Sequence, residues 1–175
     1  IGFGAVLLWS LLAVLTVQAE PVPPLQLTAM SFAVASLAAL GWLAADGKLY
    51  DLARVPPGVV GFGTLGLFGY HALYFAALRR APAAEASLIN YLWPLLIVLL
   101  SGVLPGEHLR RGHVFGAGLA FLGAALIVVA GFTGVSAGAL PGYALAFFAA
   151  LTWAGYSVTS RRLEHVSSAA VWLFP

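Results

Sequence analysis

Long apolar stretches separated by short polar breaks dominate this chain of 175 residues. Six of them have the length that a helix needs to cross a bilayer, about 20 residues. They cover Ile1–Ala19, Leu25–Ala45, Gly58–Leu78, Ala86–Leu104, His113–Phe132 and Gly142–Ser160, and a seventh begins near Ser168. Each stretch is continuously apolar rather than alternating, so the pattern predicts transmembrane helices and not the strands of a β-barrel.

The composition excludes a soluble protein. Only 8% of the residues are charged and 62% are hydrophobic, whereas a typical soluble domain has about 25% charged residues. So few charges cannot cover a water-facing surface, and the high hydrophobicity also excludes a disordered chain. The net charge of +2 comes from few ionisable groups, so nothing indicates a nucleic-acid partner. The sequence predicts an all-α, polytopic transmembrane helical bundle that has the lipid bilayer as its surroundings.

Lys and Arg in the short loops predict the orientation in the membrane, because cytoplasmic loops carry an excess of these residues. With the N-terminus inside, the inner loops contain Lys48, Arg54, Arg110, Arg111, Arg161 and Arg162, and the outer loops contain Arg79 and Arg80. This asymmetry favours a cytoplasmic N-terminus.

No pattern of residues indicates an enzyme, a metal site or a cofactor. All six acidic residues lie in predicted loops or at predicted helix ends, and the four His do not have the spacing of metal ligands. The chain has no Cys, which excludes a thiol nucleophile and a thiolate metal site. We therefore expect no enzymatic activity, no metal and no cofactor.

Polar aromatic residues gather within the third apolar stretch. Tyr70 and Tyr74 are one helical turn apart, and His71 is three residues before Tyr74. Gly66 and Gly69 leave open volume beside them. Two interpretations stay open: a helix–helix hydrogen bond that satisfies His71 in the membrane, or the wall of a polar cavity.

The fourth stretch contains a helix-breaking proline next to polar and aromatic residues. Pro94 lacks an amide hydrogen, and its ring collides with the carbonyl of Asn90, so we expect a structural kink here. Asn90 and Trp93 then share a face, while Tyr91 points elsewhere. An amide, a released carbonyl and an indole at one kink suit a ligand that has both a ring and an ammonium group, although proline kinks are also common without a ligand.

Aromatic residues deep in the first and sixth stretches extend the candidate site. Trp9 and Trp153 lie too far from the ends of their stretches for the interfacial belt, and Tyr156 follows Trp153 by three residues. The run Ala5 through Trp9 weakly resembles the run Ala149 through Trp153; this match is consistent with an inverted repeat, and chance similarity of short apolar runs is the alternative. The candidate substrate-binding residues are Trp9, Tyr70, His71, Tyr74, Asn90, Tyr91, Trp93, Trp153 and Tyr156.

Small residues follow one another at four-residue spacing in the fifth stretch, at Gly112, Gly116, Ala120 and Ala124. We interpret this ridge as a scaffold that permits close helix approach. A dimer interface is the alternative, and the oligomeric state stays open.

Several of these motifs together resemble the EamA-type repeat of the drug/metabolite transporter superfamily. The block from Glu85 to Pro94 precedes the pair Gly106-Glu107, and Gly112 opens the next helix. Trp9 and Trp153 match the tryptophan found early in each repeat. The run Asn90-Tyr91-Leu92-Trp93-Pro94 is most similar to the bacterial exporters of aromatic amino acids within that superfamily.

The resemblance implies ten helices in two inverted five-helix repeats. Residues 1–137 would form the first repeat, and residues 138–175 would begin the second. It also implies alternating access in the bacterial inner membrane, with an aromatic amino acid or a similar amphipathic solute as the substrate. Two alternatives stay open: a carrier for another small solute (a cationic drug, a nucleotide-linked sugar or a vitamin) and a membrane scaffold that does not transport.

Overall fold

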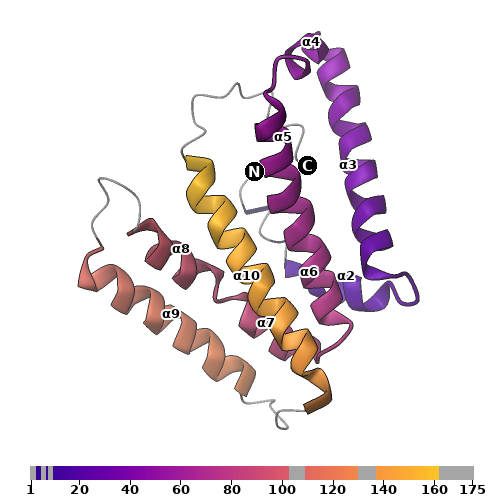
Figure 1. Cartoon of the computed structure of the whole chain (residues 1–175). Helices are drawn as coiled ribbons and strands as arrows, with labels where there is room; N and C mark the ends of the chain where they lie inside the picture. The colour runs from indigo at the N-terminus through magenta and orange to yellow at the C-terminus, as the bar shows by residue number, and fades with distance from the viewer. Residues whose placement is uncertain (1–2, 5–6, 8–9, 103–108, 130–136, 162–175) are drawn as a thin grey trace.

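The structure, a computed structural model, describes residues 3–4, 7, 10–102, 109–129 and 137–161 (Figure 1). Within these ranges all regular secondary structure is helical. The elements are α2 (Leu12–Gln18), α3 (Pro24–Ala45), α4 (Leu49–Leu52), α5 (Pro57–Gly63), the π-helical segment η1 (Thr64–Phe68), α6 (Gly69–Leu78), α7 (Ala83–Asn90), α8 (Trp93–Ser101), α9 (Arg111–Val129), the 3₁₀ turn η2 (Ala137–Ala139) and α10 (Leu140–Ser160). The prediction of an all-α fold is confirmed for this part of the chain.

Three helical stretches are long and apolar enough to cross a membrane. They are Pro24–Ala45, Pro57–Leu78 and Ala83–Ser101. The second runs through α5, η1 and α6, and the third runs through α7 and α8. The chain is thus a membrane protein by length and composition. The count of six spans stays a prediction, and the seventh stretch lies outside the described residues.

Prolines decide where several of these helices begin. Pro24, Pro57, Pro94 and Pro141 each occupy one of the first two positions of a helix. Proline is favoured there because the first amide groups of a helix have no carbonyl partner in any case. At the other end of α3, Gly47 has a φ of 69°, a left-handed conformation that ends helices and suits glycine.

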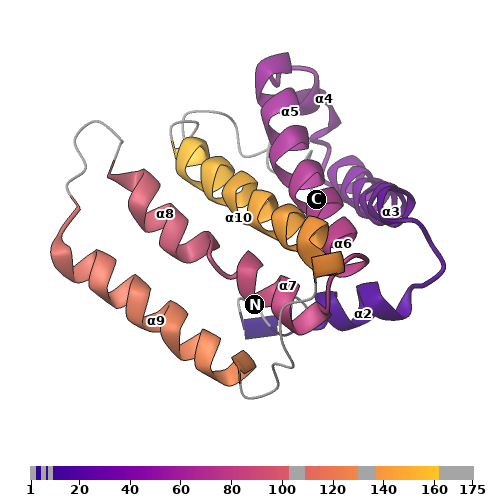
Figure 2. The same ribbon diagram turned by 60° about the horizontal axis from the view of Figure 1, so that its bottom comes forward.

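α10 lies at the centre of the described bundle and packs against α6, α7 and α8. α3 contacts α6 on one side of the molecule, and α9 contacts α8 and α7 on the other (Figures 1 and 2). The face that α10 presents to the core consists of small residues. Ala146, Ala149, Ala150 and Ala154 are all fully buried, which allows the backbones of neighbouring helices to approach closely.

Gly142 shows how close one of these approaches is. A Cβ atom at this position would lie 2.7 Å from the backbone carbonyl carbon of Arg80 and 2.8 Å from the backbone nitrogen of Ala81. The first turn of α10 therefore sits directly on the turn between α6 and α7. Tyr143, the next residue, donates a hydrogen bond to Glu85 in the first turn of α7.

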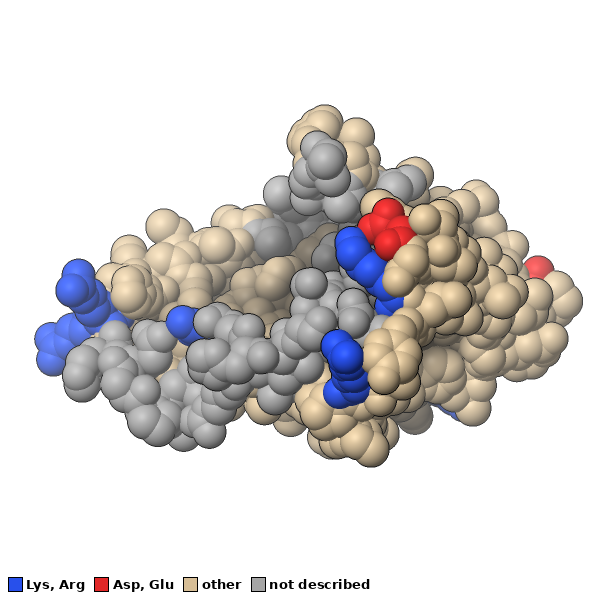
Figure 3. Space-filling model, turned by 90° about the horizontal axis from the view of Figure 1, so that it is seen from above, with Lys and Arg blue, Asp and Glu red and all other residues tan. Residues whose placement is uncertain are grey.

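Large apolar side chains cover the outside of the bundle. Val34 and Leu37 on α3 are both 69% exposed, and Phe115 and Leu126 on α9 are 74% and 73% exposed. In the view from above, charged side chains occupy only small, separate areas of the described surface (Figure 3). Such faces suit contact with lipid, because in water they would expose large apolar areas.

Two glycines of the small-residue ridge of α9 have no neighbouring helix in the described part of the chain. Gly112 and Gly116 are exposed, and a Cβ at either position would meet nothing within 4 Å. These two glycines therefore mediate no close helix approach within the described part of the chain. Ala120 instead borders a pocket between α8 and α9, and the side chain of Ala124 is not described.

Candidate substrate site

The helix interruption predicted at Pro94 is present in the structure. α7 ends at Asn90, and α8 begins at Trp93 with Pro94 in its second position. The amide of Tyr91 still reaches the carbonyl of Ser87 at 2.8 Å, but the amide of Leu92 turns to Ile89 at 3.1 Å. The break lets Tyr91 reach the same cavity as Asn90 and Trp93, although Tyr91 would lie on another face of a straight helix.

This cavity has a volume of about 320 Å³, within the usual range of roughly 300–1,000 Å³ for small-molecule sites. Its lining residues are Ser10, Leu12, Ala13, Tyr70, Tyr74, Ser87, Asn90, Tyr91 and Trp93. They come from the start of the chain, from α6 and from the region of the break. A wall of apolar and aromatic groups with a few polar atoms is typical of a binding site for a small amphipathic molecule.

Two side-chain hydrogen bonds join α6 to α7 along the wall. The amide nitrogen of Asn90 donates to the hydroxyl of Tyr70 at 3.0 Å, and the hydroxyls of Tyr74 and Ser87 are 2.9 Å apart. Asn90 is only 5% exposed, and its Oδ1 atom has no hydrogen-bond partner. The wall therefore contains an unsatisfied buried acceptor.

Aromatic rings support this wall from behind. The rings of Tyr70 and Tyr74 stack with centroids 5.9 Å apart. Trp153 of α10 lies 4.9 Å from the ring of Tyr70 and 6.4 Å from that of Trp93. Trp153 itself does not line the cavity. It fixes the position of two residues that do, because packed rings restrict each other's rotation.

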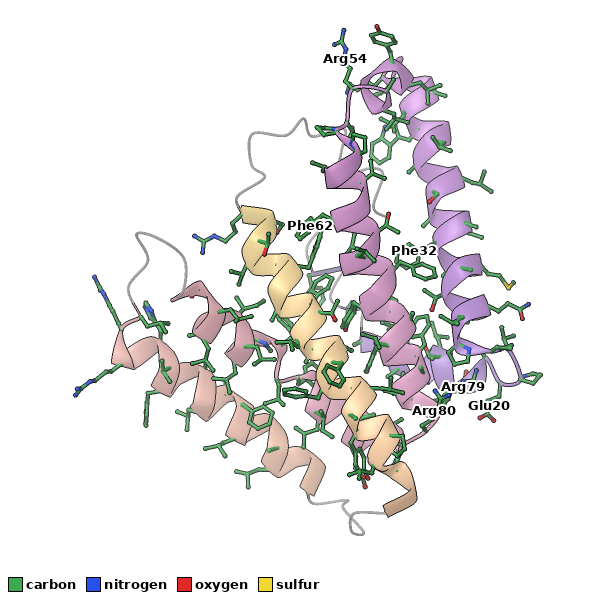
Figure 4. The ribbon with its side chains drawn as sticks, viewed as in Figure 1. Glu20, Phe32, Arg54, Phe62, Arg79 and Arg80 are labelled. Carbon is green, nitrogen blue, oxygen red and sulfur yellow. The ribbon has the colours of Figure 1, made fainter. Side chains whose placement is uncertain are left out.

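His71 lies on a different side of α6. Its Nδ1 atom is 2.8 Å from the carbonyl oxygen of Leu67, within the same helix. Its ring packs edge-on against Phe32 of α3 at 5.3 Å and against Phe75 at 5.8 Å, and Figure 4 shows Phe32 between α3 and α6. His71 does not line the cavity, so the structure does not place all three residues of the predicted stripe on one wall.

Tyr156 is also not part of the described wall. The ring of Tyr156 stacks on Phe62 with centroids 5.1 Å apart, and it lies against Gly66 of η1. Figure 4 shows Phe62 beside α10. Tyr156 thus packs α10 against the π-helical segment. Trp9 lies outside the described residues.

Tyr91 differs from its expected position. The sequence predicted that it points away from Asn90 and Trp93, but its side chain borders the same cavity. Tyr91 also borders a second, apolar pocket of about 220 Å³ between α8 and α9. Because the helix ends at Asn90, straight-helix geometry does not apply one residue later.

Ser87 and the residues from the start of the chain are cavity residues that the sequence reasoning missed. Ser87 lies three residues before Asn90 and four before Tyr91 on the same helix, and this spacing could have identified it. Ser10, Leu12 and Ala13 border the cavity because α2 packs against α6 and α7. No residue type in that segment indicates such a role.

Comparison with known proteins shows the class to which this fold and cavity belong. The sequence profile described as the EamA-like transporter family matches residues 1–129. The chain belongs to this family of membrane transporters. The resemblance inferred from the block around Pro94 is thereby confirmed.

The relatives are transporters as well. The chain is 45% identical over 173 residues to an aromatic amino acid exporter, YddG, of Ancylobacter novellus; the match covers 98% of this chain and 60% of the relative. It is 30% identical over 57% of its length to an uncharacterized transporter, YyaM, of Bacillus subtilis. It is 35% identical over 45% of its length to a probable terminal-alkyne amino-acid exporter of Streptantibioticus cattleyicolor.

A solved structure shares the fold. The chain superposes on a crystal structure with a TM-score of 0.79 and 44% sequence identity, covering 99% of this chain and 61% of the other. The chain therefore spans about 60% of the length of the first relatives that it matches.

Proposed function

We propose that this protein exports aromatic amino acids, or similar small amphipathic solutes, across the bacterial inner membrane. The observation that carries the proposal is the cavity at the helix break. There Asn90, whose buried Oδ1 atom has no hydrogen-bond partner, and Trp93 line the same small volume. A molecule with a ring and an ammonium group matches both features. The aromatic amino acid exporter among the relatives supports this choice of substrate.

The strength of the expected contacts suits a transporter. An aromatic ring packed against another contributes about 0.5–1.5 kcal/mol beyond its buried area. An ammonium group over an indole face contributes about 2 kcal/mol when it is desolvated. Contacts of this size bind a solute but still allow its release, which an exporter needs at each cycle.

The architecture that we propose has ten helices in two inverted repeats, with residues 1–137 as the first repeat and α10 as the opening helix of the second. α10 packs against α6, α7 and α8, so the second repeat would begin in direct contact with the elements that carry the cavity. Movement of one repeat against the other would then open the cavity alternately to the two sides of the membrane.

We also propose that the N-terminus is cytoplasmic. The loop with Lys48 and Arg54 would lie inside the cell, and the loop with Arg79 and Arg80 outside. Figure 4 shows Arg54 at one end of the molecule and Arg79, Arg80 and Glu20 at the other, as this orientation requires.

Transport by the full-length protein in liposomes tests the function. Labelled phenylalanine should leave loaded vesicles through the wild-type protein. Trp93→Ala should slow this efflux by about tenfold, because it removes the proposed contacts of the indole with the substrate's ring and ammonium group. Trp42→Ala, on α3 with 59% exposure, is the matched control and should transport at the wild-type rate. Unchanged efflux with Trp93→Ala would refute the assignment of the site.

A further inference from the structure

The unsatisfied acceptor of Asn90 indicates which part of a substrate the cavity binds. Asn90 Oδ1 is buried without a partner, while the other end of the same amide is held by the hydroxyl of Tyr70. A buried acceptor without a donor is costly, and native proteins rarely retain one. A ligand that supplies an N–H group would remove this cost. The acceptor therefore favours a ligand with an amine.

The charges around the cavity point in the same direction. None of the residues described as lining it is Lys, Arg or His. The Nδ1 atom of His71 is within hydrogen-bond distance of the carbonyl oxygen of Leu67. The imidazole ring packs against Phe32 of α3 and not against the cavity. Arg79 is bound by Glu20 at 3.3 Å and by the carbonyl of Val22 at 3.1 Å, at the far end of α6. A buried carboxylate needs a cation or several strong donors, and the described part of the wall offers no cation.

We infer that the cavity recognises its substrate through the amine and the ring and does not require a carboxylate. It then binds aromatic monoamines, such as phenethylamine, as well as aromatic amino acids. Asn90 is the residue that determines this specificity, since its Oδ1 atom accepts from the ammonium group. The inference rests on the proposed function, because it places the proposed substrate in the same cavity.

Three compounds that differ by one group test the inference. Binding of phenylalanine, phenethylamine and 3-phenylpropanoate to the full-length protein is measured by titration calorimetry at neutral pH. Phenethylamine, which lacks the carboxylate, should bind within a few-fold of phenylalanine. 3-Phenylpropanoate, which lacks the amine, should bind about tenfold more weakly or worse, the loss expected for a hydrogen bond to a charged group.

The outcomes separate the two proposals. If phenethylamine binds and phenylalanine does not, recognition through the amine and the ring holds, but an aromatic amino acid is not the substrate. If phenylalanine binds but phenethylamine does not, or if 3-phenylpropanoate binds as tightly as phenethylamine, the inference is wrong and the proposed function stands. If none of the three binds, both are wrong.

Two substitutions of Asn90 assign the effect to this residue. Asn90→Leu removes the acceptor with little change in size and should weaken phenethylamine binding by about tenfold. Asn90→Asp keeps an oxygen and adds a negative charge, so it should bind phenethylamine at least as tightly as the wild type. Gln26→Leu, at an exposed position on α3, is the matched amide-to-leucine control and should change nothing. Loss of amine binding with Asn90→Asp, in a variant that unfolds at the wild-type temperature, would overturn the role given to Asn90.

Discussion

Tyr70 is the residue that connects the cavity wall to the core behind it. It is only 2% exposed. Its hydroxyl accepts a hydrogen bond from Asn90. Its ring stacks on the ring of Tyr74 and also packs against the ring of Trp153. One side chain therefore links α6, α7 and α10. We expect the geometry of the wall to depend on it more than on any ligand-facing contact.

Removal of this hydroxyl should destabilise the protein. Tyr70→Phe leaves the buried amide nitrogen of Asn90 without a partner, which costs about 1–3 kcal/mol. Tyr74→Phe is the matched comparison and should cost less, because its partner Ser87 is only partly buried and faces the cavity, where water can replace the lost bond. The unfolding temperatures of the purified variants measure the difference. Equal temperatures for both would show that the bond to Asn90 is not buried as described.

The residues of the cavity could be predicted in part from the sequence. Helical spacing correctly placed Tyr70 and Tyr74 on one wall, and proline chemistry brought Asn90 and Trp93 to the same region. His71 could not be placed, because its orientation depends on Phe32 of α3, which lies far away in sequence. The role of these residues in binding stays a prediction.

At the scale of the helices, contact between α10 and the α6–α7 turn depends on one glycine. Gly142→Ala would push a methyl group into the backbone of Arg80 and Ala81, which cannot move as a side chain can. We expect a loss of stability, although alanine is the better helix former by about 1 kcal/mol. Gly155→Ala in the same helix meets nothing within 4 Å and should be neutral or stabilising. Thermal unfolding of both variants checks this, and a stabilised Gly142→Ala would contradict the packing.

Helix ends and the π-helical segment differ in how far sequence predicts them. Helix starts and the break before α8 follow from prolines, whose effects are local. The π-helical turn at η1 carries no such local mark. It lies where Gly66 meets the ring of Tyr156 from α10, a contact between residues far apart in the sequence, and π-helical turns are rare within α-helices.

For the whole molecule, the orientation in the membrane can be tested with single introduced cysteines, since these 175 residues contain none. Ala84→Cys, at an exposed position at the start of α7, should react in intact cells with a thiol reagent that does not cross the membrane. Lys48→Cys, in the loop after α3, should react only after the cells are opened. The reverse pattern would place the N-terminus outside.

The central position of α10 could not be expected from hydrophobicity alone. Apolar stretches predict that helices span a membrane, but lipid and protein neighbours are equally apolar. The small buried face of Ala146, Ala149, Ala150 and Ala154 distinguishes α10, and it identifies the helix that other helices surround.

Protection of one cavity residue by substrate tests the central claim most directly. Ser87→Cys in the full-length protein places a thiol in the cavity wall. Lys48→Cys, in the exposed loop after α3 and outside the cavity, serves as the control. A water-soluble thiol reagent should label both variants, and phenylalanine should slow the labelling of Ser87→Cys without affecting that of Lys48→Cys. If Ser87→Cys does not react, or reacts at the same rate with saturating phenylalanine, the cavity is not the pathway of the substrate.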